Sequence, residues 1–281
     1  MDIVERAQSL VFLGGIFFGI ILLIGLVPVS DDRTQLRLQH PKLTRVMLVE
    51  LIWPLFNPIV VGPVMLVFAY WIGERFLNHV IGYHIFAESI ASLHVGVQVV
   101  LALAIIDLTT YIRHRFVHIF GWPYHVVHHS ATQIHWTTTT RLHPGDTIIM
   151  GSVKVIIMYV FGFGGVAMVT ALFIYSIMNW LNHLNFNLDW PGLFRYIFVS
   201  PNMHRWHHAA DDPLAINTNF AVVFAFWDLF FGTFYLPKNR LPGAYGVWDE
   251  KGLDVVSEGF FDQLSYPFRH HWSWLSARLT R

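Results

Sequence analysis

The chain has 281 residues, of which 54% are hydrophobic and only 13% are charged, whereas ordinary soluble domains are about a quarter charged. A mean hydropathy of +0.48 predicts a membrane protein, and a formal net charge of zero gives no basic surface for nucleic acid. The chain has no cysteine, which excludes disulfides, thiolate zinc sites and cysteine-bound iron–sulfur clusters.

Apolar runs long enough to enter a bilayer define the membrane part of the chain. The first run lacks a basic leader and a small-residue cleavage site, so we expect a retained span and not a signal peptide. Pro54, Pro58 and Pro63 predict that the second helix is kinked or re-entrant. The last two runs are joined by a short glycine-rich turn, which predicts a helical hairpin. The apolar runs are residues 10–29, 51–72, 89–110, 147–161 and 164–181.

Basic residues predict the orientation in the membrane. The segment 31–45 carries four of them and should be cytoplasmic under the positive-inside rule. Three crossings and a hairpin then bring the polar segments that follow residues 110 and 181 to that same cytoplasmic side. The segment 220–235 predicts a buried or interfacial helix, because a charge and a glycine interrupt it. We therefore expect one all-α membrane domain over residues 1–281, a multi-pass bundle of about four to five membrane-crossing or re-entrant helices with a cytosolic, histidine-rich catalytic cap.

Histidines gather in the polar segments that follow the apolar runs. His114 and His118 are four residues apart and share a helix face, and a His-x-x-His-His pattern occurs at 125–129 and again at 204–208. Imidazole is a good ligand for iron, zinc and copper, and one ion takes about four to six ligands, so this many nitrogens predict two metal ions. We expect the two repeated patterns to converge into one pocket. The candidate ligands are His114, His118, His125, His128, His129, His143, His183, His204, His207 and His208.

Other polar residues are candidates for supporting roles. Asp107 and Tyr111 continue the stripe of His114 toward the N-terminus, and Asp107 is expected to orient a ligand histidine through its ring N–H. The alternative is that this is a solvated helix end. Arg141 and Arg205 either pair with a buried aspartate or face lipid headgroups. The isolated histidines are expected to be ordinary hydrogen-bonded residues: His40, His79, His84, His94, His135, His270 and His271.

The metal chemistry that suits these residues is oxidation. A catalytic metal site keeps an open coordination position, whereas a structural site is closed. Iron with nitrogen ligands and an open position activates dioxygen, and unactivated C–H bonds of a lipid have no acidic proton for a base to remove. Two other classes remain open at this stage. A membrane metal-binding or transport protein would distribute its histidines along the spans, and a bis-histidine haem electron carrier would need histidine pairs facing each other across them.

The motifs resemble those of the fatty acid hydroxylase / sterol desaturase superfamily of integral-membrane non-haem di-iron enzymes. The matching strings are DLTTYIRHRFVH from Asp107, WPYHVVHHS from Trp122, RLHP from Arg141, NHLN from Asn182, and HRWHH from His204, followed by NFAVVFAFWDLFFGTF. They cover residues 100–237 in the family's order. The resemblance implies two iron ions, with zinc as an alternative occupant, dioxygen as co-substrate, a lipid or sterol-like substrate, and a separate cytochrome- or ferredoxin-type electron donor.

The chain departs from the family pattern at two positions, and the reaction type stays open. Some members carry a further histidine four residues after the position of His183, where this chain has Asn187. Asn187 could bind a metal directly, bind it through water, or leave one metal with fewer ligands. Many members have glycine where this chain has Ala221, which reshapes a pocket wall. Hydroxylation and desaturation share one kind of centre, and we favour hydroxylation as the simpler outcome.

Overall fold

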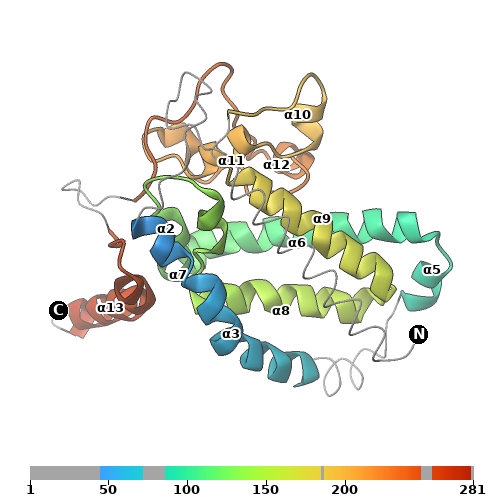
Figure 1. The fold of residues 1–281 in the computed structure, drawn as a ribbon, viewed down its shortest axis with the longest axis horizontal. Coiled ribbons are helices and arrows are strands. Elements are labelled where there is room, and N and C mark those ends of the chain that lie inside the picture. Colours follow the sequence, from blue (N-terminus) through green and yellow to red (C-terminus); the bar gives the residue numbers. More distant parts are fainter. Residues whose placement is uncertain (1–44, 72–85, 185–186, 248–254, 280–281) are drawn as a thin grey trace.

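Helices joined by loops make up the computed structural model, which describes residues 45–71, 86–184, 187–247 and 255–279 (Figure 1). Within these residues backbone pairing between strands is limited to two isolated bridges, so the described chain is all-α as predicted. The predicted span 10–29 and almost all of the basic segment 31–45 lie outside the described residues. The helices are α2 (Arg45–Glu50), α3 (Trp53–Tyr70), α5 (Ala87–Ala91), α6 (Val95–Phe120), α7 (Trp122–His129), η2 (Trp136–Thr140), α8 (Pro144–Phe161), α9 (Gly165–Asn182), α10 (Phe194–Ile197), α11 (Pro201–His207), η3 (Pro213–Ala215), α12 (Phe226–Phe230) and α13 (Phe260–Leu279).

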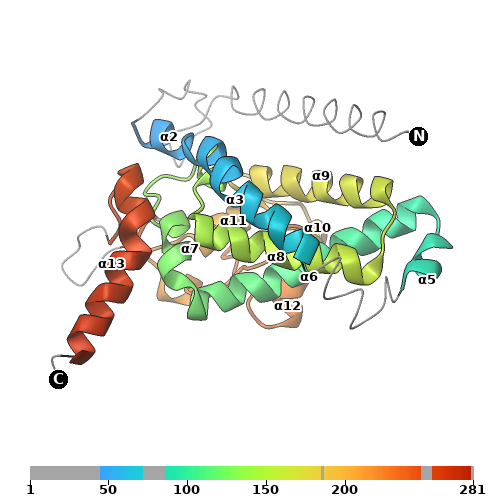
Figure 2. The same ribbon diagram turned by 90° about the horizontal axis from the view of Figure 1, so that it is seen from below.

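Long apolar helices form the membrane bundle. Three stretches of the described chain are long and apolar enough to cross a bilayer: Leu48–Phe68, Val95–Phe120 and Gly165–Asn182. Helix α8 packs against both α3 and α6, and α9 packs along α6 (Figures 1 and 2). The prediction of an all-α membrane bundle is therefore confirmed.

Helix α6 is longer than the span predicted at 89–110. It begins at Val95, after the separate short helix α5, and continues ten residues past Thr110 to Phe120. Its 26 residues extend about 39 Å at about 1.5 Å per residue, which exceeds the roughly 30 Å hydrocarbon core of a bilayer. One end of α6 must therefore project, and the polar C-terminal end with His114 and His118 is the end suited to do so.

Small residues allow α6 and α9 to approach closely. Ala102 of α6 and Ala171 of α9 are both fully buried in one apolar cluster with Ile106 and Tyr175. Such small side chains are typical of contacts between membrane helices. Helix α3 runs through two internal prolines as a single helix. The bundle thus holds α9 next to α11, and His114 near the C-terminal end of α6 lies beside His207 of α11, with ring centroids 4.5 Å apart.

The segment 220–235 differs from its prediction as one helix. Only Phe226–Phe230 is helical, and the preceding backbone is irregular. The reason is that two buried carboxylates accept its amide hydrogens. Asp228 accepts from the N–H groups of residues 220 and 221, and Asp107 accepts from those of residues 222, 223 and 224. These five bonds replace those that a helix would have made.

Candidate metal centre

Nine of the ten candidate histidines come together at the C-terminal ends of α6 and α9. They form two sets, and within each set one ligand nitrogen per residue lies within 4.8 Å of all the others. The sets draw on α6, α7, the end of α9 and α11, so segments more than 90 residues apart in the sequence contribute to one place. The first set is His114, His118, His125, His129 and His207, and the second set is His128, His183, His204 and His208.

Each His-His pair contributes one residue to each set. His128 belongs to the second set and His129 to the first; His208 belongs to the second and His207 to the first. Neighbouring residues on a helix point about 100° apart, so consecutive histidines can serve two adjacent centres. The sets are themselves adjacent, because the ring centroids of His129 and His208 are 4.4 Å apart. The two repeated patterns therefore converge, as the sequence predicts.

The second set has its Nε2 atoms turned toward one another. His183 Nε2 lies 3.0 Å from that of His204 and 3.3 Å from that of His128, and His208 Nε2 lies 3.2 Å from that of His204. With metal–nitrogen bonds of about 2.0–2.1 Å, the nitrogens of one ion lie about 2.9 Å apart at right angles and about 3.4 Å apart in a tetrahedron. The spacing of this set fits nitrogens that share one metal ion.

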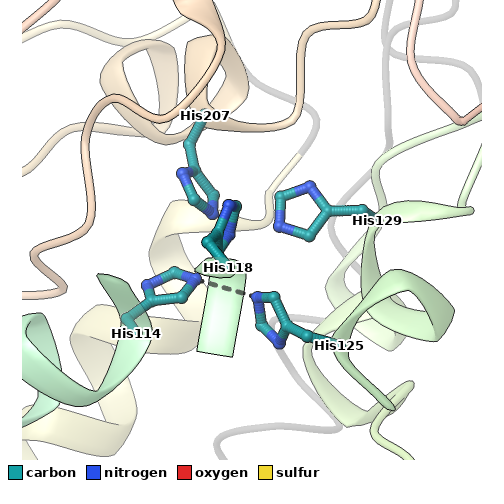
Figure 3. Close-up of side chains that lie close together, drawn as sticks. All are labelled: His114, His118, His125, His129 and His207. Atoms are coloured by element: carbon teal, nitrogen blue, oxygen red, sulfur yellow. Dashed lines mark hydrogen bonds between the residues drawn. The ribbon is translucent and has the colours of Figure 1, made fainter. Parts of the chain in front are cut away.

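The first set is built in the same way (Figure 3). His114 Nδ1–H donates to the carbonyl of Phe220 at 2.9 Å and His207 Nδ1–H donates to that of Thr218 at 2.7 Å. A carbonyl can only accept, so Nδ1 carries the hydrogen and Nε2 keeps a free lone pair for a metal. The Nε2 atoms of His114 and His125 face each other at 3.0 Å, and those of His118 and His207 have no hydrogen-bond partner among the described residues. The donor set fits a second transition-metal ion.

The imidazoles outside the membrane helices are held neutral. Burial lowers the pKa of His183 to about 4 and that of His207 to about 3. Burial, together with neighbouring histidines, also holds the pKa values of His128, His204 and His208 well below the ordinary value. Metal ligation requires the neutral imidazole, so at neutral pH these side chains are already in the ligating form.

Asp146 is a site residue that the sequence reasoning missed. Its carboxylate accepts from His125 Nδ1–H at 2.8 Å and from Arg113 Nη1 at 3.2 Å. Burial raises the pKa of Asp146, but His125 and Arg113 outweigh it and the net shift is downward, so the group is ionised at neutral pH. A carboxylate behind a ligand histidine fixes its tautomer and orientation. The one sequence feature that could have indicated this role is that Asp146 is the single acidic residue in the first turn of an apolar helix. An acidic residue there is explained more simply by its favourable interaction with the helix N-terminus.

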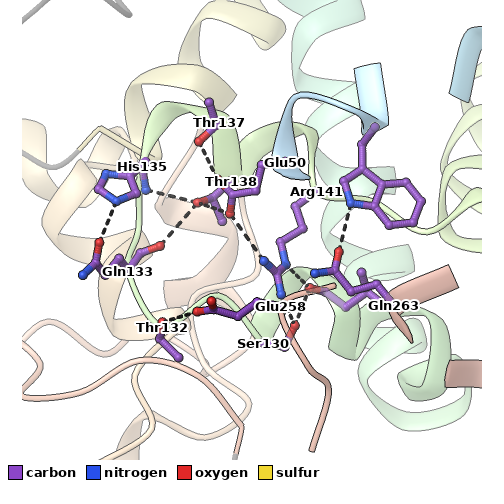
Figure 4. Close-up of polar contacts among 12 residues, drawn as sticks. Glu50, Ser130, Thr132, Gln133, His135, Thr137, Thr138, Arg141, Glu258 and Gln263 are labelled. Atoms are coloured by element: carbon purple, nitrogen blue, oxygen red, sulfur yellow. Dashed lines mark hydrogen bonds and ion pairs between the residues drawn. The ribbon is translucent and has the colours of Figure 1, made fainter. Parts of the chain in front are cut away.

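Arg141, which lies beside Ser130 in Figure 4, fixes the end of α7, the helix that carries His128 and His129. Its Nε donates to the carbonyl of Val127 at 2.8 Å and its Nη2 to the hydroxyl of Ser130 at 2.7 Å. The cation thereby satisfies a carbonyl that a helix C-terminus would leave unpaired.

Glu50 lies next to Arg141 and completes this buried network. Its carboxylate is 3.7 Å from Arg141 Nη1 and accepts from the hydroxyls of Thr137 and Thr138. Arg141 thus pairs with Glu50, not with the aspartates that the sequence suggested. Arg205 donates to the carbonyl of Leu184, next to His183.

Asp107 and Tyr111 act on the centre through the backbone, which corrects the predicted contact between Asp107 and a ligand histidine. The carboxylate of Asp107 accepts hydrogen bonds from the three backbone N–H groups of residues 222–224. The carboxylate that binds a histidine is that of Asp146. Tyr111 forms a hydrogen bond with the hydroxyl of Thr233, which in turn donates to Asp228. These contacts hold in place the irregular backbone segment that includes Phe220, whose carbonyl accepts a hydrogen bond from His114.

Two candidate residues lie outside both sets. His143 has both ring nitrogens engaged elsewhere: Nδ1 accepts from the N–H of Gly145 and Nε2–H donates to the carbonyl of Leu264. Asn187 is exposed and its side-chain oxygen accepts from Asn202 at 2.9 Å. The sets are formed without either residue.

Comparison with known protein families supports the resemblance that the histidine motifs indicate. The sequence profile described as fatty acid hydroxylase matches residues 99–233, which include all nine clustered histidines and Asp146. The match assigns residues 99–233 to the fatty acid hydroxylase superfamily. No solved structure matches the chain.

Its relatives include enzymes that act on lipids. The chain is 32% identical to an ornithine lipid hydroxylase of Rhizobium tropici over 179 residues, which cover 61% of this chain and 50% of the relative. It is 27% identical to an alkylglycerol monooxygenase of Caenorhabditis elegans over 171 residues, or 59% of this chain and 31% of the relative. It is 26% identical to the corresponding enzyme of Danio rerio over 185 residues, or 61% and 38%. The chain therefore spans half or less of the length of these relatives.

Proposed function

We propose that the protein is a dioxygen-dependent hydroxylase of an amphiphilic membrane lipid, with one iron ion in each histidine set. The observation that carries the proposal is the pair of adjacent sets, which are linked by two His-His pairs that each contribute one residue to each set. Four and five imidazoles leave positions open on ions that accept about six ligands, and an open position is what separates a catalytic from a structural site. Iron, unlike zinc, can also change its oxidation state.

The overall reaction balances with an external reductant. A C–H bond of the lipid, dioxygen, two electrons and two protons give an alcohol and water, so a separate electron donor of the cytochrome or ferredoxin type must supply the electrons. When bound, the two ions supply the two-electron reduction of dioxygen that this reaction needs. The protein supplies neutral ligands, the carboxylate of Asp146 behind His125, and buried surroundings that exclude bulk water. Hydroxylation is favoured over desaturation because the relatives are a hydroxylase and a monooxygenase.

We infer that the centre lies at the cytoplasmic face of the membrane. Both sets lie at one end of the apolar helices, and the basic residues that precede the second span favour a cytoplasmic location for that end. Soluble electron donors would then reach the centre directly. The same clustering weighs against a metal-transport function, because a transport path would place ligands along the spans.

Lipid analysis under isotopically heavy dioxygen tests the proposal. Cells that express the chain should contain a membrane lipid that has gained one heavy oxygen atom. Cells that express His128→Ala should lack it, whereas His270→Ala, a change at an exposed histidine of α13 outside both sets, should retain it. Identical lipid profiles in all three strains, with the protein present in the membrane of each, would remove the support for an oxygenase.

A further inference from the structure

A groove beside α3 carries an inference about the substrate, and this inference rests on the proposed function. The groove has a volume of about 470 Å³, within the usual range of about 300–1,000 Å³ for small-molecule sites. One wall is α3, and the others come from η2, α8 and α9. Its lining residues on α3 are Pro54, Asn57, Pro58, Val61, Gly62 and Met65.

The groove has a polar end and an apolar end. Asn57 Nδ2 donates to the carbonyl of Leu142 just before α8, whereas a Cβ on Gly151, two turns into α8, would touch Met65. Helices α3 and α8 therefore run side by side in the same direction. The groove begins near η2 and continues along α3 past Val61 and Gly62 into the apolar span Leu48–Phe68.

The polar end offers two hydrogen-bonding atoms that the described protein leaves unused. The Oδ1 atom of Asn57 and the hydroxyl of Thr139 are buried and have no hydrogen-bond partner among the described residues. The other three threonines of η2 bind Glu50 through their hydroxyls, so Thr139 is the exception within its own run. A buried polar atom without a partner is unfavourable, and both Asn57 and Thr139 line the groove, so the pair points to a ligand that hydrogen-bonds with them.

The apolar end has room for a hydrocarbon chain. A Cβ built on Gly62 meets no heavy atom of the described residues within 4 Å, so the helix surface there is open space. Val61 and Met65 give the remaining apolar wall on the same side of α3. The outward side of the helix is different, because Val60 and Val64 are 41% and 47% exposed and do not line the groove.

The polar end also adjoins the elements that support the metal centre. Asn179 lines the groove, and its carbonyl accepts from His183 Nδ1–H at 2.8 Å. Thr147 lines it too and directly follows Asp146, the partner of His125. A ligand in this groove would therefore lie against Asn179, which holds His183 of the second set, and next to the neighbour of Asp146, which holds His125 of the first set.

We propose that this groove binds the lipid substrate, with an alkyl chain along Gly62 and a hydroxyl or amide group at Asn57 and Thr139. The hydroxyl or amide donates to Asn57 Oδ1 and accepts from the hydroxyl of Thr139. Its occupant is one chain of an amphiphile whose headgroup remains at the end of the bundle where the metal centre lies.

Photolabelling of the purified full-length protein in detergent tests the groove independently of catalysis. The probe is a long-chain monoalkylglycerol with a diazirine in its alkyl chain, used without dioxygen or reductant, and the labelled residues are located by mass spectrometry. The wild type should be labelled within Pro58–Met65. Gly62→Leu should lower this labelling about tenfold because the new side chain occupies the open space and overpacks a bound chain. Val64→Phe, which adds bulk on the outward side, should label like the wild type.

The variant Thr139→Val separates a binding role from a structural one. It removes an unpaired hydroxyl and keeps the shape, so thermal stability should stay the same or rise, while probe affinity falls about fivefold for a lost hydrogen bond of about 1 kcal/mol. Equal labelling of Gly62→Leu and the wild type, or labelling only outside the groove, would overturn the proposal. If the wild type is labelled in the groove but oxidises no lipid in cells, the proposed function alone is contradicted. If the wild type oxidises lipid but Gly62→Leu is labelled as strongly as the wild type, the groove alone is contradicted.

Discussion

Replacing Asp146 by Asn tests how the protein prepares its ligands. The carboxylate accepts from His125 Nδ1–H at 2.8 Å and from Arg113 at 3.2 Å, and all three side chains are almost completely buried. Asn keeps the size and one acceptor oxygen but removes the charge. His125 then loses the anion behind its ring, and Arg113 becomes a buried cation without its counter-charge.

The two consequences have different sizes and different readouts. Losing the partner of a ligand histidine lowers metal affinity by about 10–100-fold, or about 1.4–2.7 kcal/mol. Leaving a buried cation unpaired costs up to about 3–5 kcal/mol of folding stability, and less here because Asn can still accept a hydrogen bond. Because His125 belongs to the first set only, one of the two ions should bind more weakly and the other should be unaffected.

Iron titration in competition with a coloured chelator measures both ions. The wild type should release them at similar chelator concentrations, whereas Asp146→Asn should release one at a concentration at least about tenfold lower. The matched control is Asp262→Asn, which breaks an exposed pair with Arg269 at 3.4 Å worth at most about 1 kcal/mol. If Asp146→Asn binds both ions within twofold of the wild type while still folded, the role assigned to this carboxylate is wrong.

Three further changes test the supporting structure. Arg141→Lys removes the bonds to Val127 and Ser130. It should lower the melting temperature in detergent, with a loss of roughly 3 kcal/mol of folding stability, and should reduce iron binding in both sets. An unchanged melting temperature would show that the end of α7 does not depend on Arg141. Asp107→Asn leaves one side-chain oxygen for three N–H groups and should lower the free energy of unfolding, measured with denaturant, by about 2–3 kcal/mol. The folded fraction should still bind iron. Iron loss without destabilisation would argue that Asp107 is a direct ligand. For the metal-free protein, the folded pKa of His183 is about 4 and that of His207 about 3, below the ordinary value of about 6.5. The unfolded chain therefore binds more protons between these values, so stability is complete above about pH 6.5 and falls on acidification toward pH 4; equal melting temperatures at pH 7 and pH 5 would contradict this.

The sequence predicted the clustering of the histidines better than the residues that support them. Histidine spacing on helices is a local pattern, so both His-His pairs and the membrane helices could be recognised from the chain alone. Asp146 and His125 are 21 positions apart, and Glu50 and Thr137 are 87 positions apart. No local sequence pattern predicts contacts between residues so far apart in the chain.

Local apolar patterns also misled where buried carboxylates replace a helix. The segment 220–224 has the composition of a helix, but Asp107 and Asp228 take its amide hydrogens. The sequence likewise placed Asp107 beside a histidine because both lie on one stripe of α6. The stripe exists, but the helix turns that carboxylate toward the backbone of residues 222–224.

The metal content of the purified protein tests the central claim most directly. We predict about two iron atoms per chain for the wild type, and about one for each of His128→Ala and His129→Ala, which remove neighbouring residues from different sets. The two single variants should each keep the ion that the other loses, and the double variant should bind neither. One iron atom or none in the folded wild-type protein, prepared without chelators, would contradict the account.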